Sequence, residues 1–199
     1  DTANRILFHP AYDEVNDLVN GRIRVITSGN TGFLNRQGKE VVSTKYQSGT
    51  DFNPSGLAKV KSENKYGLID TLGTFRLPAV YDWIGSLDGP YIALRQNRNF
   101  TIYDQAQNEI LPGTYDQIAE PLDRVSAVQK SGKWYLLDLN NSLETPLEGT
   151  LVQGLGSMRW SMFQDQKWYL VDASGTLLNE TGFKQINRFQ DDRACCMQD

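Results

Sequence analysis

The sequence predicts an all-β protein built from tandem repeats of about 34 residues, and two observations predict this fold class. No 11-residue window shows sustained helical periodicity. A short segment of shared pattern also recurs at a nearly constant interval, with an aromatic residue at the start of four copies and Asp at the end of four. The five copies are Thr31–Asn35, Tyr66–Asp70, Phe100–Asp104, Trp134–Asp138 and Trp168–Asp172.

Two further series of residues share the same period. A Tyr–Asp motif supplies the first, with Tyr12, Tyr46, Tyr81 and Tyr115, then Gly149, which breaks the pattern, and Phe183, which restores an aromatic ring. A buried aliphatic position supplies the second, with Val25, Val60, Leu94, Val128 and Met162, and its next step is Cys196. Three series with one period indicate a true internal repeat.

A single unit reads as a β-meander. Residues 57–61 and 65–70 have the composition of two short strands, and 74–77 supply a third. The turn between the second and third begins at Asp70 and ends at Gly73. An Asp at the first turn position bonds the backbone two residues on, and Gly accepts positive φ. The turns 35–38 and 172–175 repeat this chemistry.

The stretch from Lys65 to Gly73, followed by Pro78 and Tyr81–Asp82, resembles the WG (or KWG) β-repeat of bacterial proteins. The glycine that follows the aromatic residue in this family is kept only as Gly32 and Gly67. Three bulkier residues replace it in the later units: Thr101, Tyr135 and Tyr169. The resemblance implies a repeat scaffold and brings with it no catalytic or ligand-binding residue.

We therefore predict one WG-like repeat domain over residues 1–199. Its five full units are 12–45, 46–80, 81–114, 115–148 and 149–182, and partial units occupy 1–11 and 183–199. A unit this short cannot bury a core alone, so neighbours must share one. The short period favours an open superhelical or solenoid-like array. The alternative is a small five- or six-bladed β-propeller, in which the partial ends would meet.

Composition excludes several classes of partner. The net charge is −4 and the pI about 5.1, which gives no general attraction to nucleic acid or to an anionic membrane. No stretch reaches the roughly 18 apolar residues that membrane insertion needs. The two cysteines, Cys195 and Cys196, provide no disulfide framework, which weakly favours the cytoplasm. The chain begins at Asp1 and not Met, so a periplasmic or secreted location stays open.

The sequence contains no recognisable catalytic or metal-binding set. His9 is the sole histidine, so we expect no Ser-His-Asp triad, no zinc site and no cofactor. The recurring Asp residues are interpreted as turn residues, although a hydrolase built on two such carboxylates is an alternative. Asp191–Asp192 is read as a solvated turn. Cys196 occupies the aliphatic position, which predicts a buried thiol, and the recurring Trp134 and Trp168 are predicted to lie in the core.

Residues that depart from the repeat are the candidates for a binding surface, because residues that hold the core recur. Trp83 and Tyr91 could form an aromatic patch on the third unit. Trp160 is oversized for its position, and we weigh a binding role against a role in capping the core. The sequence thus predicts a non-enzymatic scaffold that binds a protein partner, and an inhibitor or immunity-type protein is a specific version of this prediction. A carbohydrate or cell-wall binding module is the other binding alternative.

Overall fold

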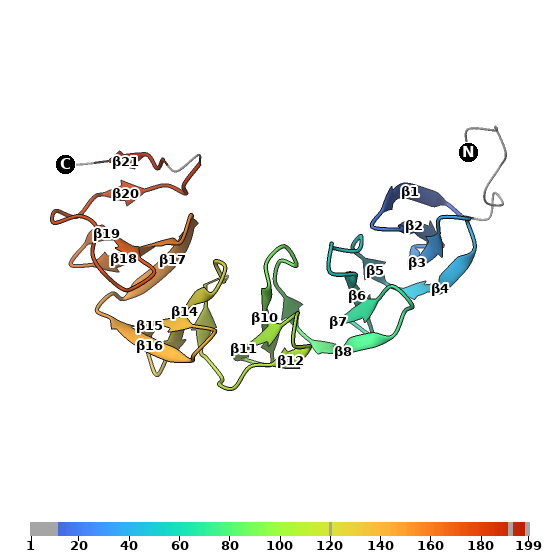
Figure 1. The fold of residues 1–199 in the computed structure, drawn as a ribbon, viewed down its shortest axis with the longest axis horizontal. Coiled ribbons are helices and arrows are strands. Elements are labelled where there is room, and N and C mark those ends of the chain that lie inside the picture. The colour runs from blue at the N-terminus through green and yellow to red at the C-terminus, as the bar shows by residue number, and fades with distance from the viewer. Residues whose placement is uncertain (1–11, 120, 191–192, 198–199) are drawn as a thin grey trace. The chain divides into compact units, whose positions relative to one another are not determined.

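The computed structural model describes residues 12–119, 121–190 and 193–197, and these residues form strands and turns with no helix (Figure 1). The predicted all-β fold class is therefore confirmed. Contacts divide the chain into two compact units, residues 1–87 and 88–199, which are described separately.

The first compact unit contains two antiparallel four-stranded meanders (blue to green in Figure 1). In both sheets each strand pairs with the next along the chain. The first sheet comprises β1 (Glu14–Val19), β2 (Arg22–Thr27), β3 (Asn30–Asn35) and β4 (Glu40–Tyr46). The second comprises β5 (Ser48–Gly49), β6 (Leu57–Ser62), β7 (Lys65–Asp70) and β8 (Phe75–Tyr81), and the short β9 (Trp83–Ile84) follows it.

The second compact unit repeats the meander with shorter outer strands. Its first strands are β10 (Tyr91–Gln96), β11 (Asn99–Asp104) and β12 (Glu109–Ile110). The next sheet contains β13 (Gln117–Ile118), β14 (Val125–Lys130), β15 (Lys133–Asp138) and β16 (Leu143–Leu147). Then come β17 (Leu151–Gly156), β18 (Arg159–Gln164) and β19 (Lys167–Asp172), and finally β20 (Gln185–Ile186) and β21 (Cys196–Met197).

Neighbouring sheets share a core, as the short repeat requires. In the first compact unit Phe33 and Val42 of one sheet pack with Val60 and Ile69 of the next, and Phe52 meets the ring of Phe33 at 4.8 Å between centroids. The predicted aliphatic position is buried from Val25 through Met162. The prediction fails at Cys196, whose thiol is exposed, because β20 and β21 form a sheet of only two strands.

The recurring Asp residues hold the turns, as predicted. Oδ1 of Asp70 accepts hydrogen bonds from the backbone N–H groups of Leu72 and Thr74, at 2.9 and 3.0 Å. Asn35 makes the same pair of bonds in the preceding sheet. Each of the other three carboxylates, those of Asp104, Asp138 and Asp172, also accepts from the N–H two residues further on. These side chains therefore replace backbone partners that each turn would otherwise lack.

The glycine of the WG motif is required by a close approach of two strands. A Cβ on Gly67 would lie 2.8 Å from the carbonyl oxygen of Leu77 and 2.9 Å from the backbone nitrogen of Ala79. Gly32 meets the backbone of β4 in the same way. At both places the strand pairing is irregular, with a register shift that adds residues to the outer strand.

Candidate functional site: a pocket in the fourth repeat

One pairing recurs between the aromatic position and the Tyr–Asp motif, fifteen residues further along the chain. It joins Thr31 to Tyr46, Tyr66 to Tyr81, Phe100 to Tyr115 and Trp168 to Phe183. The fourth repeat is the exception, since Trp134 pairs with Leu147, two residues before the position that the period predicts. Gly149, which breaks the Tyr–Asp series, is the residue that this shift leaves out.

The residue at the glycine position differs in this repeat, but it does not by itself explain the shift, because Tyr169 occupies the same position in the fifth repeat and Trp168 there keeps its pairing with Phe183. Tyr135 stands where Gly67 stands in the second repeat, and it pairs directly with Pro146. The register shift around Gly67 brings two backbones too close for a side chain, so a tyrosine cannot adopt that arrangement. Strands β15 and β16 pair without a bulge from Asp138 to Trp134, and residues 148–150 continue beyond the sheet.

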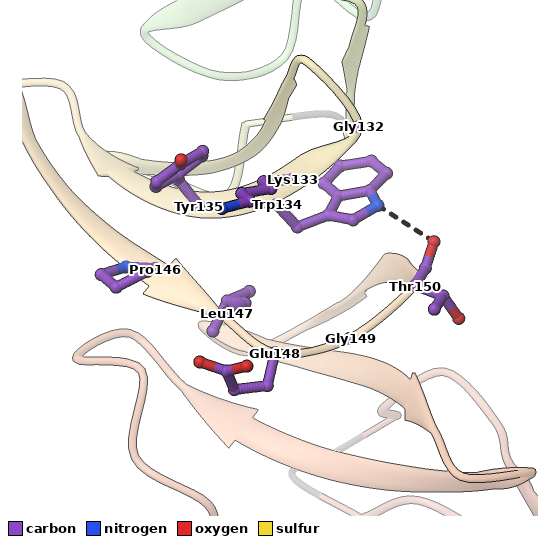
Figure 2. A pocket seen from close by; sticks show the side chains of 9 residues that line it. All are labelled: Gly132, Lys133, Trp134, Tyr135, Pro146, Leu147, Glu148, Gly149 and Thr150. Carbon is purple, nitrogen blue, oxygen red and sulfur yellow. Dashed lines mark hydrogen bonds between the residues drawn. The ribbon is translucent and has the colours of Figure 1, made fainter.

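A pocket of about 450 Å³ lies where the register has shifted (Figure 2). Its walls come from the start of β15 and from the segment that follows β16. The lining residues are Gly132, Lys133, Trp134, Tyr135, Pro146, Leu147, Glu148, Gly149 and Thr150. The indole N–H of Trp134 donates to the carbonyl oxygen of Thr150 at 3.3 Å, which fixes the two walls relative to each other.

Met162 occupies the inner side of this region. A Cβ on Gly149 would collide with the Met162 side chain, which is itself buried. Met162 has the longest and most flexible side chain in the aliphatic series, and it packs against Gly149. Met162 is not among the residues that line the pocket, whose walls include Trp134 and the exposed Pro146.

A second pocket, of about 440 Å³, brings together two of the turn carboxylates. Asp138 and Asp172 line it with Arg124 and Arg159. The hydroxyl of Ser174 donates to Asp172 and is the main cause that lowers the pKa of that carboxyl, with help from the backbone N–H groups of Thr176 and Ser174 and from the charge of Arg159. These hydrogen bonds are used to hold the turn.

The three predicted binding residues lie on three different strands. Trp83 lies half-buried on β9, in the first compact unit, and Tyr91 lies on β10, in the second. The Tyr91 hydroxyl donates to Oδ1 of Asn140 at 2.9 Å. Trp160 has no exposed surface and packs with Val125 and Met162, and its indole N–H has no partner among the described residues. Its burial matches the core-capping interpretation.

The two recurring tryptophans differ in burial. Trp134 lies in the core, as predicted, with 3% of its surface exposed. Trp168 is only half-buried, contrary to the prediction, and its ring lies 5.0 Å from that of Phe163. The difference follows from the sheets, because β15 lies between β14 and β16, whereas β19 is an outer strand of a three-stranded sheet.

Sequence reasoning on departures from the repeat did not find the pocket. Tyr135 was visible as a replacement for glycine and Gly149 as a break in the Tyr–Asp series, and both signals fall in this one place. Among the described residues no group of three or more His, Cys, Asp or Glu could hold a metal ion. The search of the same part of the chain also finds no helix fit to span a membrane.

The fold defines a tandem β-repeat protein of the kind that serves as a binding or scaffold domain. Residues 32–66 and 66–99 match the model of the WG containing repeat, so this part of the chain is similar to that family. These two matches include both units that keep the glycine of the motif. No curated protein matches the sequence.

Two solved structures have a similar fold. One is Hsv2 of Kluyvelomyces marxianus, with 9% identity and a TM-score of 0.51, which covers 87% of this chain and 67% of that one. The other is a eukaryotic initiation factor, with 10% identity and a TM-score of 0.53; the match covers 89% of this chain and 57% of the factor. Such propeller-like folds fit the predicted propeller alternative. At this identity the likeness shows the fold alone.

Proposed function

We propose that this protein is a non-catalytic repeat scaffold that binds a protein partner through the pocket of the fourth repeat. Repeat arrays present surfaces to partners, and the residues available for contact are those that the shared pattern does not use for its core. The proposal covers the pocket formed by residues 132–135 and 146–150, called the fourth-repeat pocket below.

One observation carries the proposal: among the described residues, the pocket lies where the aromatic position of a repeat, Trp134, does not pair with the position of the Tyr–Asp motif. Its size suits one side chain of a partner, and its walls combine Leu147 and Pro146 with the polar Lys133 and Glu148. An apolar recess with a charged rim is the usual anchor point of a protein interface. The turn carboxylates, in contrast, are occupied by hydrogen bonds within their own turns.

Affinity capture with matched variants tests the proposal. Pro146→Arg places a long charged side chain at the pocket rim, and Pro78→Arg places the same side chain at the equivalent exposed position of the second repeat. The immobilised wild type, Pro146→Arg and Pro78→Arg proteins are each exposed to lysate of the source cell. We expect a protein that is retained by the wild type and by Pro78→Arg and lost from Pro146→Arg.

Two results would overturn the proposal. One is a retained protein that tolerates Pro146→Arg as well as Pro78→Arg, which would place the interface elsewhere. The other is binding to glycans or isolated cell wall that Pro146→Arg abolishes, which would identify the carbohydrate alternative. Circular dichroism of both variants checks that neither substitution unfolds the chain.

A further inference from the structure

The second repeat shows what the fourth repeat lacks. At the start of β7, Lys65 forms an ion pair with Asp82, and the neighbouring Tyr66 pairs with Tyr81. The Tyr–Asp dipeptide of one unit is therefore held by a Lys–aromatic dipeptide of the unit before it. The ring of Tyr81 is buried, and the carboxylate of Asp82 compensates the lysine charge.

The fourth repeat keeps the Lys–aromatic dipeptide but lacks the Tyr–Asp dipeptide that this pair contacts in the second repeat. Lys133 and Trp134 occupy the positions of Lys65 and Tyr66. Gly149 and Thr150 occupy the positions of Tyr81 and Asp82, and they supply neither ring nor charge. Within the described part of the chain Lys133 forms no ion pair, and its side chain is exposed at the pocket rim.

The carboxylate of the Tyr–Asp motif has a partner elsewhere in the array too. Oδ2 of Asp13 accepts from the backbone N–H of Ser28, and Oδ2 of Asp116 accepts from that of Ser131. These two bonds lie within one unit each, whereas the Lys65–Asp82 ion pair shows that the edge of a unit can receive a ring followed by a carboxylate from the next unit. Thr150 instead donates its hydroxyl to the carbonyl oxygen of Phe163.

We propose that the fourth-repeat pocket binds a partner segment in which an aromatic residue is followed by Asp or Glu. This inference rests on the proposed function and names the chemistry of the partner. The ring packs outside Met162, against Leu147, Pro146 and Tyr135, and the carboxylate faces Lys133. Figure 2 shows Lys133 and Glu148 on opposite walls, so Glu148 lies away from the carboxylate and sets the direction of the bound segment.

The expected effects differ in size for the two parts of the ligand. Burial of an aromatic ring dominates small interfaces, so its removal should weaken binding by more than about tenfold. An ion pair at an exposed rim contributes little, so removal of the carboxylate should weaken binding by about threefold at low salt. The smaller effect should disappear at high salt, because exposed charges are screened.

A peptide copied from the chain itself provides the probe. A fluorescein-labelled peptide of residues 78–85 carries the Tyr81–Asp82 dipeptide in its own context. Fluorescence anisotropy with the full chain measures its affinity, together with peptides carrying Tyr81→Ala or Asp82→Asn. We expect the Tyr81→Ala peptide to lose binding and the Asp82→Asn peptide to bind about threefold more weakly. Lys133→Ala should cause the same threefold loss, whereas Lys39→Ala, at an exposed lysine on another unit, should cause none.

The pairing is tested by a double-mutant cycle. If Lys133 faces the carboxylate, Asp82→Asn has no further effect on binding to the Lys133→Ala protein. The inference is overturned by no binding of the peptide, by equal affinity of the three peptides, by independent effects in the cycle, or by binding that survives Pro146→Arg. If these outcomes occur while capture of a protein still depends on Pro146, the proposed function stands and only the partner chemistry is wrong.

Discussion

The hydroxyl of Tyr91 donates a hydrogen bond to Oδ1 of Asn140, 2.9 Å away, and so joins β10 to the turn of the following repeat. Arg22 does the same in the first compact unit, where its Nε donates to the carbonyl oxygen of Thr71 at 2.8 Å. Arg22 and Tyr91 occupy one position of the repeat. Between the fourth and fifth repeats this position is Val125, which cannot donate, and the second pocket lies there.

Substitution of Tyr91 should weaken the contact between the third and fourth repeats. Tyr91→Phe removes one partly exposed hydrogen bond and leaves the ring, so we expect the free energy of unfolding to fall by about 0.5–1 kcal/mol. Urea denaturation followed by circular dichroism measures the change. Tyr135→Phe is the control, and an equal loss for both variants would show that the Asn140 bond contributes nothing.

The Tyr91 bond also predicts a dependence of stability on pH. Burial, followed by the charges of Asp104, Asp138 and Asp123, raises the pKa of Tyr91 above its ordinary value of 10.0. A raised pKa favours the neutral phenol in the folded state, so its contribution is complete below about pH 10 and is lost as pH rises through the folded-state pKa. Thermal melts from pH 8 to 11 should therefore fall less steeply for Tyr91→Phe than for the wild type; parallel curves would contradict the prediction.

Asp70 tests the structural role of the turn carboxylates. Asp70→Ala removes the acceptor of the Leu72 and Thr74 N–H groups, and we expect a loss of about 1–2 kcal/mol in the free energy of unfolding. Asp70→Asn keeps Oδ1, as the natural Asn35 does, and should cost much less. Asp70→Asn also removes the 3.3 Å ion pair with the exposed Arg76, which contributes little to the free energy of unfolding. Chemical denaturation ranks the variants, and equal losses would argue against the turn role.

Gly67 should not tolerate a side chain. Gly67→Ala forces a methyl group against the backbone of Leu77 and Ala79, and we expect a loss of about 2 kcal/mol or more, because a backbone cannot move aside as a side chain can. Gly89→Ala is a suitable comparison, since the nearest atom to its Cβ is the Tyr91 carbonyl oxygen at 3.8 Å and its φ is not positive. Differential scanning calorimetry compares the two; similar melting temperatures would refute the close-approach explanation.

Gly149 and Met162 should be strongly coupled. Gly149→Tyr alone restores the aromatic series but collides with Met162, so it should destabilise the chain. Met162→Val alone leaves a cavity and should also destabilise it. Together they recreate the Tyr–Val combination of the second unit, and we expect a favourable coupling of about 1–3 kcal/mol in a double-mutant cycle of unfolding free energies. Additive losses would mean that Met162 does not stand in for the missing ring.

The period, the strands and the turns were predictable because they depend on local chemistry. The Asp70 turn and the buried Val60 follow from residue type and spacing within one unit, and the structure shows both. The predicted burial of Cys196 was wrong because its position in the series assumes strands on both sides. In the described residues β21 has a neighbouring strand on one side only. The position of a residue within the repeat therefore predicts its burial only inside a complete sheet.

The pocket was less predictable, since it results from strand register. Tyr135 and Gly149 are fourteen positions apart in the sequence. Each departure from the repeat pattern, taken alone, can be explained without a pocket. Only the observed pairing of Trp134 with Leu147 shows that the strand is unbulged here and that Gly149 lies outside the ladder. Tyr169, at the same position of the fifth repeat, leaves the pairing of Trp168 with Phe183 in place. Register depends on how the two strands fit together, and periodicity does not report that fit.

The Asx-type turns have a consequence for how such a chain can diverge. The two hydrogen bonds that the Asp70 carboxylate accepts from the backbone come from residues within four positions of it. A duplicated unit therefore carries its own turn with it and does not depend on its neighbour to form that turn. This independence leaves the edge positions free to drift, and an array that began as identical copies can acquire one specialised unit, as the fourth unit here has, without losing the others.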